Sequence, residues 1–247
     1  MNVELDVKRH RSLFNPAEWG NRRVDVIGCG AIGSRLAMEL AKLGVTNLHL
    51  WDDDIVESHN IPNQFFYNTD IGKKKVDAIA EHIVQATGNR PSIHDERVDG
   101  SQELGEVIFV LTDSMKSRKE IWERAIINNY TVEVMIEARM GLSGGKVFTI
   151  NPNDLDHIDI WKGSSHFDDS RAQPSACGGK VSVGPTAAII ACSMAWQFIN
   201  WFRYDKDLKD PNLPDEKKRG WPSKRLYLDF NPFSVTTDVH FESKDEE

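Results

Sequence analysis

Residues 24–54 read VDVIGCGAIGSRLAMELAKLGVTNLHLWDDD and indicate the fold class most directly. The mostly apolar segment 24–27 leads into a glycine-rich turn, apolar residues recur at helical spacing over 32–42, and a second mostly apolar segment, 48–51, ends at three aspartates. A strand, a turn, a helix and another strand in this order are typical of a parallel α/β sheet. We therefore expect the chain to open with such a unit.

The glycines of the turn suit a nucleotide site. We expect Gly28 to permit the tight turn, Gly30 to let a phosphate approach bare backbone, and Gly33 to let the helix pack close to its strand. The helix N-terminus adds unpaired N–H groups and the positive end of a dipole, which favour an anion. Asp52 follows at about the distance of a ribose-binding carboxylate in such units. Together these features predict nucleotide binding rather than a merely structural turn.

The alternation continues along the chain and predicts an α/β fold with a Rossmann-like, mostly parallel sheet flanked by helices. We expect a single domain over 1–247. Outside its regular part lie an N-terminal arm at 1–22, a long crossover loop at 151–180 and a charged insertion at 205–225. The further expected helices are 70–87, 117–128 and 186–202, and the further expected strands are 107–111, 131–136, 146–150, 226–230 and 235–241.

The composition argues against several kinds of protein. A formal net charge of -8 disfavours a nucleic-acid surface, which normally needs a basic face. Three cysteines without a C-x-x-C pair cannot build a disulfide framework or a four-cysteine zinc site, so we expect no zinc and a cytoplasmic location. The first residues are too charged for a signal peptide, and the apolar segment 186–202 is too short for a membrane span.

A cluster of polar residues follows the second strand. It comprises Asp52, Asp54, Asn60, Gln64 and Lys75. An NAD-dependent oxidoreductase needs little that is special here, so the cluster disfavours that class. Lys75 ends a Gly-Lys-Lys-Lys run where ammonium and helix dipole could both act on a polyphosphate. A solvated helix end is the alternative interpretation of an isolated lysine run.

Asp113 follows the strand expected at 107–111, at the carboxyl edge of the sheet where ligands bind in open α/β folds. A carboxylate there can hold Mg²⁺ against phosphate oxygens. The structural alternative is that Asp113 or Ser114 caps the next helix, with Ser117 and Glu120 forming a capping box. The residues alone leave both open.

Five motifs in this order resemble the ThiF/MoeB/HesA family, the bacterial relatives of ubiquitin-activating enzymes. The family pattern is a glycine loop, D-x-D, N-x-x-R-Q, D-x-G-x-x-K and D-N-x-x-x-R. The matching segments are 28–33, 52–54, 60–64, 70–75 and 113–118. The resemblance covers roughly residues 11–202 and implies antiparallel strands at the C-terminal side of the sheet.

The resemblance also implies a function. Family members use ATP and Mg²⁺ to adenylate the C-terminal carboxylate of a small ubiquitin-like or sulfur-carrier protein, with release of pyrophosphate, and are generally homodimers. Carried over, Asp52 would hold the ribose, Lys75 would offset phosphate charge, and Asp113 would hold the metal. Asn60, Gln64 and Asp54 would line the ATP site.

Two departures from the family pattern bear on this function. The arginine before Gln64 is Asn63 here, so a cation expected near the phosphates is absent from that position. Arg11, in the basic run of the N-terminal arm, could supply charge across a dimer. The cysteine quartet that often binds a structural zinc in the family is also missing.

The cysteines and loop histidines have competing interpretations. Cys177 stands eight residues before Pro185, which matches the spacing of the family's conjugating or sulfur-relay cysteine, and Lys180 could favour its thiolate. An inert small side chain is the alternative. We expect Cys192 in the core and Cys29 as a small side chain of the turn. His157 and His166 are expected in a solvated loop rather than a metal site.

The leading hypothesis is therefore an ATP-dependent adenylyltransferase acting on a protein or peptide C-terminus, with the long loop gripping that tail. Two alternatives stay open. One is a family member acting on a tRNA base, as the cyclodehydratases do, which the acidic charge disfavours. The other is a catalytically decayed binding protein, in which Asn63 marks the decay. Retention of Lys75 and Asp113 argues against it.

Overall fold

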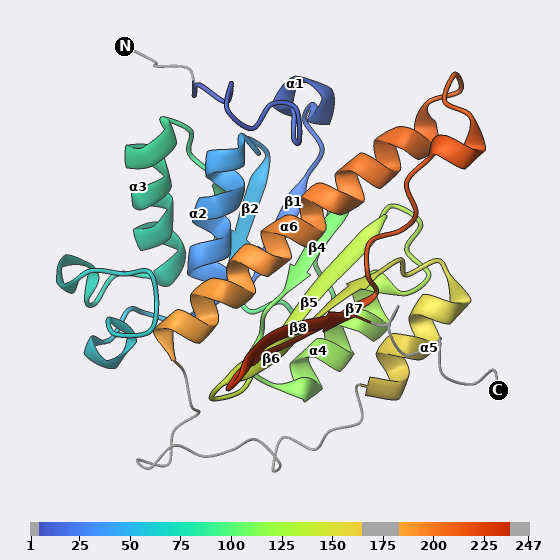
Figure 1. Cartoon of the computed structure of the whole chain (residues 1–247). Helices are drawn as coiled ribbons and strands as arrows, with labels where there is room; N and C mark the ends of the chain where they lie inside the picture. The colour runs from blue at the N-terminus through green and yellow to red at the C-terminus, as the bar shows by residue number, and fades with distance from the viewer. Residues whose placement is uncertain (1–4, 165–182, 238–247) are drawn as a thin grey trace.

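The computed structural model describes residues 5–164 and 183–237, which form one sheet covered by helices on both faces (Figure 1). Within this part of the chain the sheet has eight strands in the order β3-β2-β1-β4-β5-β6-β7-β8. The strands are β1 (Val24–Ile27), β2 (Leu48–Trp51), β3 (Ser92–His94), β4 (Val107–Val110), β5 (Val134–Met140), β6 (Gly144–Ile150), β7 (Arg225–Phe230) and β8 (Phe233–Thr237).

Strands β1 to β5 pair in parallel, and β6, β7 and β8 continue the sheet in antiparallel pairs. β1 sits between β2 and β4, with Val24 opposite Leu48 on one side and Val107 on the other. Every residue of β1 and β4 is buried, as expected of strands covered on both faces. β4 is wholly apolar, whereas β1 contains Asp25, whose buried carboxylate accepts hydrogen bonds from the indole N–H of Trp51 and from Gly105 N–H. The predicted fold class is confirmed.

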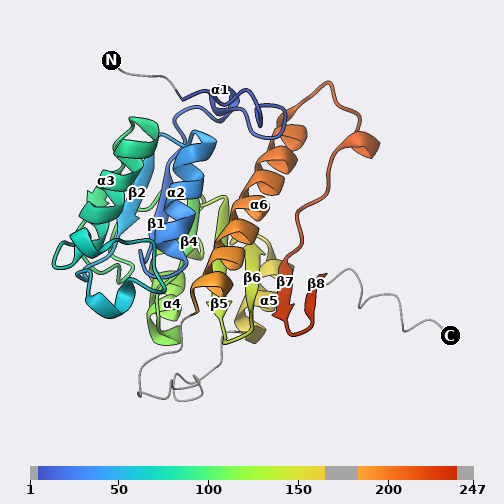
Figure 2. The same cartoon turned by 60° about the vertical axis from the view of Figure 1, so that its left-hand side comes forward.

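The helices form two layers. α2 (Gly33–Leu43), α3 (Lys75–Thr87) and α6 (Gly184–Lys209) pack with one face of the sheet through one apolar cluster (Figure 2). α4 (Met115–Ile121), its π-helical continuation η3 (Trp122–Ile126) and α5 (Leu155–Ser164) pack with the other face through a second cluster. The short helices are α1 (Pro16–Trp19) and the 3₁₀ turns η1 (Ser58–Asn60), η2 (Asn68–Asp70) and η5 (Asp215–Lys217).

Several boundaries differ from the sequence expectation. The helix expected from 70 starts at Lys75, because Gly72 has φ +92° and Lys74 is still extended. The loop expected at 151–180 contains α5, and α6 runs on to Lys209 inside the expected insertion 205–225. Strand β3 was not expected from the sequence at all. Only its three residues pair with β2.

The expectation that Cys192 lies in the core is wrong. Cys192 lies on α6 but is exposed, because it shares the outward face of that helix with Ile189 and Trp196. No helix in the described residues has the length and apolar character that crossing a membrane requires.

Candidate functional site

The glycine turn joins β1 to α2 against the end of β4. Gly28 has φ +97°, and a Cβ there would lie 2.8 Å from the carbonyl oxygen of Leu111. A Cβ on Gly33 would lie only 1.8 Å from the carbonyl oxygen of Gly28. A Cβ on Gly30 would meet no atom within 4 Å. Two of these glycines are therefore needed for close backbone packing, whereas Gly30 borders open space.

Asp52 ties the end of β2 to this turn. Its Oδ2 accepts a 2.7 Å hydrogen bond from the backbone N–H of Cys29, and its Oδ1 accepts one from Asp54 N–H. Burial raises the pKa of Asp52 above its ordinary value, while the ammonium of Lys75 and the two N–H donors act in the opposite direction. Cys29 itself is fully buried, so it lies in the turn as a small interior side chain.

Lys75 reaches the same place from the start of α3. Its backbone N–H donates to the carbonyl of Asp54, and the neighbouring Ile55 and Lys74 form an antiparallel bridge. The ammonium lies 2.7 Å from Asp54 Oδ2 and 4.0 Å from Asp52 Oδ1, and only 8% of the side chain is exposed. The two motifs, far apart in sequence, thus place a cation and two carboxylates at one end of β2.

Asp70 holds the turn that delivers Lys75. Its buried carboxylate accepts a hydrogen bond from Tyr67 N–H and lies 3.0 Å from Nε2 of His82. The sequence did not single out His82, because a lone histidine among the apolar residues of a helix gives no local signal of its partner. The aspartate and histidine are structural supports of the lysine.

The segment around Asn60 and Gln64 packs on the glycine turn. Ser34 Oγ donates to the carbonyl of Gly30 at 2.7 Å and accepts from Phe65 N–H at 3.0 Å. Asn60 is buried, and its Oδ1 accepts from Glu57 N–H, so this oxygen holds the loop in shape. Ser34 is a connecting residue that sequence reasoning missed, since only the tertiary approach reveals its role.

The end of β4 borders the glycine turn from the other side of β1. Asp113 is exposed at the carboxyl edge of the sheet. Ser114 caps α4 by accepting a hydrogen bond from Ser117 N–H. The capping box expected between Ser117 and Glu120 is therefore wrong, because the helix starts earlier and Ser117 lies inside its first turn.

Three buried polar atoms near the turn lack hydrogen-bond partners within the described residues. They are Nε of Arg35, Oε1 of Gln64 and Oγ1 of Thr112. A buried polar group without a partner costs about 1–3 kcal/mol, so native proteins seldom keep several together without a ligand. Thr112 follows β4, Gln64 follows η1 and Arg35 follows the glycine turn. The residues present thus fit a polar ligand such as a nucleotide.

Oxygen ligands for a cation lie at the same edge. The carboxylates of Asp52, Asp53 and Asp54 lie within 4.8 Å of one another. Hard divalent cations such as Mg²⁺ take carboxylate oxygens together with substrate phosphates. The donor set therefore fits Mg²⁺, either at this aspartate group or at the predicted ligand Asp113.

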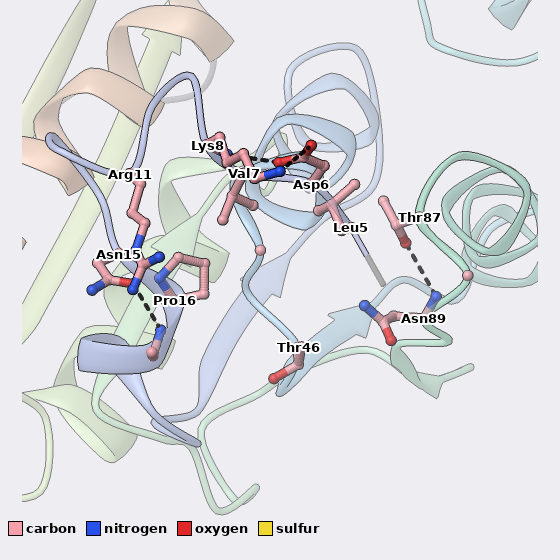
Figure 3. A pocket seen from close by; sticks show the side chains of 13 residues that line it. Leu5, Asp6, Val7, Lys8, Arg11, Asn15, Pro16, Thr46, Thr87 and Asn89 are labelled. Carbon is pink, nitrogen blue, oxygen red and sulfur yellow. Dashed lines mark hydrogen bonds and ion pairs between the residues drawn. The ribbon is translucent and has the colours of Figure 1, made fainter. Parts of the chain in front are cut away.

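Arg11 lies away from this site in its own chain. It borders a cleft of about 770 Å³ between the N-terminal arm and the loops that follow α2 and α3 (Figure 3). This cleft includes Gly44, at the end of α2 opposite to the glycine turn. A role for Arg11 at the phosphates would consequently require a second copy of the chain.

The remaining candidates divide into two groups. Cys177, Lys180 and His166 lie outside the described residues. The expectation that His157 lies in a solvated loop is wrong. His157 is buried in α5, where its Nδ1 accepts a hydrogen bond from Asn151 N–H. Burial lowers the pKa of His157, which favours the neutral ring that this acceptor role requires.

Curated relatives resemble parts of this chain to different extents. The sulfur carrier protein ThiS adenylyltransferase of Escherichia coli K12 is 24% identical over 215 residues, which cover 83% of this chain and 82% of the relative. The Nedd8-activating enzyme E1 catalytic subunit of Drosophila melanogaster is 42% identical over 62 residues, 25% of this chain and 14% of that protein.

Solved structures share the fold. Two crystal structures of Escherichia coli MccB, one with ATP and one with AMPCPP and MccA, match with a TM-score of 0.64 each at 16% and 17% identity. Both matches cover 90% of this chain but 65% of MccB, so this chain spans about two thirds of that protein. The ThiF family model matches residues 15–216, which include the glycine turn, Asp52, Lys75 and Asp113. The chain belongs to the ThiF family.

Proposed function

We propose that this ThiF-family chain is an ATP-dependent adenylyltransferase that activates a C-terminal carboxylate. The observation that carries the proposal is the meeting of Lys75 and Asp52 at the glycine turn, beside the open backbone of Gly30. The partnerless buried atoms around the turn and the ATP complex of the similarly folded MccB support it.

Each residue has a proposed role in holding the nucleotide. Asp52 binds the ribose hydroxyls. Lys75 leaves its ion pair with Asp54 and neutralises charge on the phosphates, and the N–H groups at Gly30 face these phosphates. Asn60 and Gln64 line the site. Asp113 would hold Mg²⁺, which when bound supplies further neutralisation of phosphate charge.

The proposed reaction is attack of a substrate carboxylate oxygen on the α-phosphorus. A bond forms between the carboxylate oxygen and the α-phosphorus, which gives an acyl-adenylate. The bond between the α-phosphorus and the oxygen that bridges to the β-phosphate breaks, and pyrophosphate leaves. Such a displacement depends on in-line positioning and charge stabilisation, so the chain needs no activated nucleophile for this step.

The substrate proposed is the C-terminal tail of a small ubiquitin-like or sulfur-carrier protein, or a peptide. The ThiS adenylyltransferase by its name acts on a sulfur carrier, and MccB is seen with MccA. We also propose a homodimer, through which Arg11 of one copy could reach the crevice of the other. Cys177 is the proposed acceptor for any later thioester or sulfur relay.

ATP–pyrophosphate exchange in the presence of Gly-Gly-terminated small proteins tests the function. We expect the wild-type chain to exchange label, and Lys75→Ala and Asp113→Ala to lower the rate by about 100-fold or more, because each removes charge stabilisation at the phosphates. Lys206→Ala is the matched control, since its exposed ammonium pairs with Glu18 near the C-terminal end of α6. ATP binding without exchange for any offered carboxylate would instead favour a binding protein.

A further inference from the structure

We infer that Arg35 supplies the phosphate-binding cation that is missing at Asn63. This inference rests on the proposed function, since it assumes that the crevice receives ATP. It assigns a binding role to a residue that lies in none of the motifs by which the sequence resembles the family.

The positions of Arg35 and Asn63 support the inference that Arg35 replaces the missing arginine. Arg35 lies in the first turn of α2, two residues beyond Gly33. A Cβ built on Gly184 would lie 3.6 Å from the Nη2 atom of Arg35 and 3.8 Å from the Cα atom of Asn63. The guanidinium and the backbone at position 63 therefore border the same small space, at the start of α6. An arginine side chain at 63 would begin where this guanidinium ends.

Glycine at 184 keeps this space open. Its hypothetical Cβ would also come within 2.9 Å of the carbonyl oxygen of Pro62, which is closer than real contacts of that kind. A larger residue would push either the 62–63 backbone or the guanidinium away. The start of α6 thus brings Arg35 and the loop before Gln64 together without filling the gap between them.

The bonding state of Arg35 indicates a missing ligand. Its Nε is buried and has no hydrogen-bond partner, and the guanidinium makes no hydrogen bond or ion pair with the part of the chain that the structure describes. The carboxylate of Glu39, one turn along α2, is not within ion-pair distance of it in this same part. A guanidinium carries five donors that match phosphate oxygens in pairs, which makes a phosphate the natural partner.

The order of groups along the turn suggests which phosphates Arg35 contacts. Asp52, the proposed ribose ligand, bonds to Cys29 at the β1 end of the turn. Arg35 stands beyond Gly33, at the helix end. A triphosphate that runs along the turn from its ribose would bring its terminal phosphates toward Arg35. We therefore expect Arg35 to distinguish ATP from AMP.

Calorimetric titration of the full chain with Mg-ATP and with AMP tests the inference. Arg35→Ala should weaken ATP binding about 10- to 100-fold, the usual loss for a charged hydrogen-bond donor, and AMP binding less than about threefold. Arg35→Lys should keep part of the ATP affinity. Arg90→Ala is the matched control, because its guanidinium is exposed beside Asp77. Melting temperatures verify that each variant is folded.

Moving the guanidinium from position 35 to position 63 distinguishes a ligand-binding role of Arg35 from a structural role. Adding Asn63→Arg to Arg35→Ala should recover at least about tenfold of the lost ATP affinity, because it restores a guanidinium to the same space. Unchanged ATP binding by Arg35→Ala, or an equal loss for ATP and AMP, would overturn the inference. If the wild-type chain bound no ATP, the proposed function itself would fail, which is a different outcome.

Discussion

At the scale of single residues, Gly30 and Gly33 have different physical tasks although they stand three positions apart. Gly33→Ala would place a methyl group against the carbonyl oxygen of Gly28. We expect it to lower the free energy of unfolding by at least about 2 kcal/mol, because the backbone of the turn must move to admit it. Urea denaturation followed by tryptophan fluorescence measures this change.

Gly30→Ala provides the contrast. Its added methyl meets no atom within 4 Å, and its φ lies outside the left-handed region, so its stability should stay within about 1 kcal/mol of the wild type. It should nevertheless weaken ATP binding, because the methyl enters the space proposed for the phosphates. Equal stability losses for the two variants would contradict this division of tasks.

At the scale of elements, a buried charge cluster ties the exit of β4 to β5 and α5. Arg118 of α4 donates two hydrogen bonds to the carbonyl of Thr112 and pairs with the carboxylate of Glu137. Glu137 also accepts from Arg139 and from the indole N–H of Trp161. This cluster fixes the backbone directly before Asp113, so Arg118 is a positioning residue for the proposed metal site.

Glu137 gives this tie a pH dependence. Burial alone would raise the pKa of Glu137, but the guanidinium groups of Arg118 and Arg139 hold it below its ordinary value. A lowered folded-state pKa stabilises the fold above the unfolded value, and the contribution is lost as the pH falls through the folded value. Glu137→Gln should cost about 3 kcal/mol at neutral pH and flatten the acid limb of the unfolding curve.

Equilibrium unfolding between about pH 3 and pH 7 checks this prediction. Glu123→Gln is the control, since its carboxylate belongs to an exposed pair with Lys119 and should change stability by less than about 0.5 kcal/mol. A Glu137→Gln profile parallel to that of the wild type would show that Glu137 is not the group that titrates.

The same scale shows what local sequence can and cannot predict. The strand β4 follows from an unbroken apolar run, β1 from a short apolar segment interrupted only by Asp25, and the helix α2 from helical spacing, all of which depend only on near neighbours. α5 was missed because its segment 155–164 is largely polar, and its few buried side chains find partners only in the folded sheet. Within the site, Asp52 and Lys75 stand in motifs, whereas Ser34 and His82 act through tertiary contacts that no local pattern encodes.

At the scale of the whole molecule, α6 runs across the sheet from the neighbourhood of the proposed phosphate site to the N-terminal arm (Figure 1). The arm is fastened there by aromatic packing. The ring of Trp19 lies 5.0 Å from that of Phe198 and 5.9 Å from those of Phe14 and Phe202, and Arg22 stacks on the indole. We therefore expect stability and the proposed nucleotide binding to depend on opposite ends of one helix.

This separation predicts that the two properties can be changed independently. Trp19→Ala should lower the free energy of unfolding by about 3–5 kcal/mol, because it empties a fully buried site between the arm and α6. Trp196→Ala, on the half-exposed face of the same helix, should change it by less than about 0.5 kcal/mol. Chemical denaturation measures both values. At a temperature where each variant is folded, calorimetry should give the wild-type affinity for Mg-ATP, since the arm lies at the far end of α2 from the glycine turn. A loss of ATP affinity in folded Trp19→Ala would instead mean that the arm is coupled to the crevice through α6.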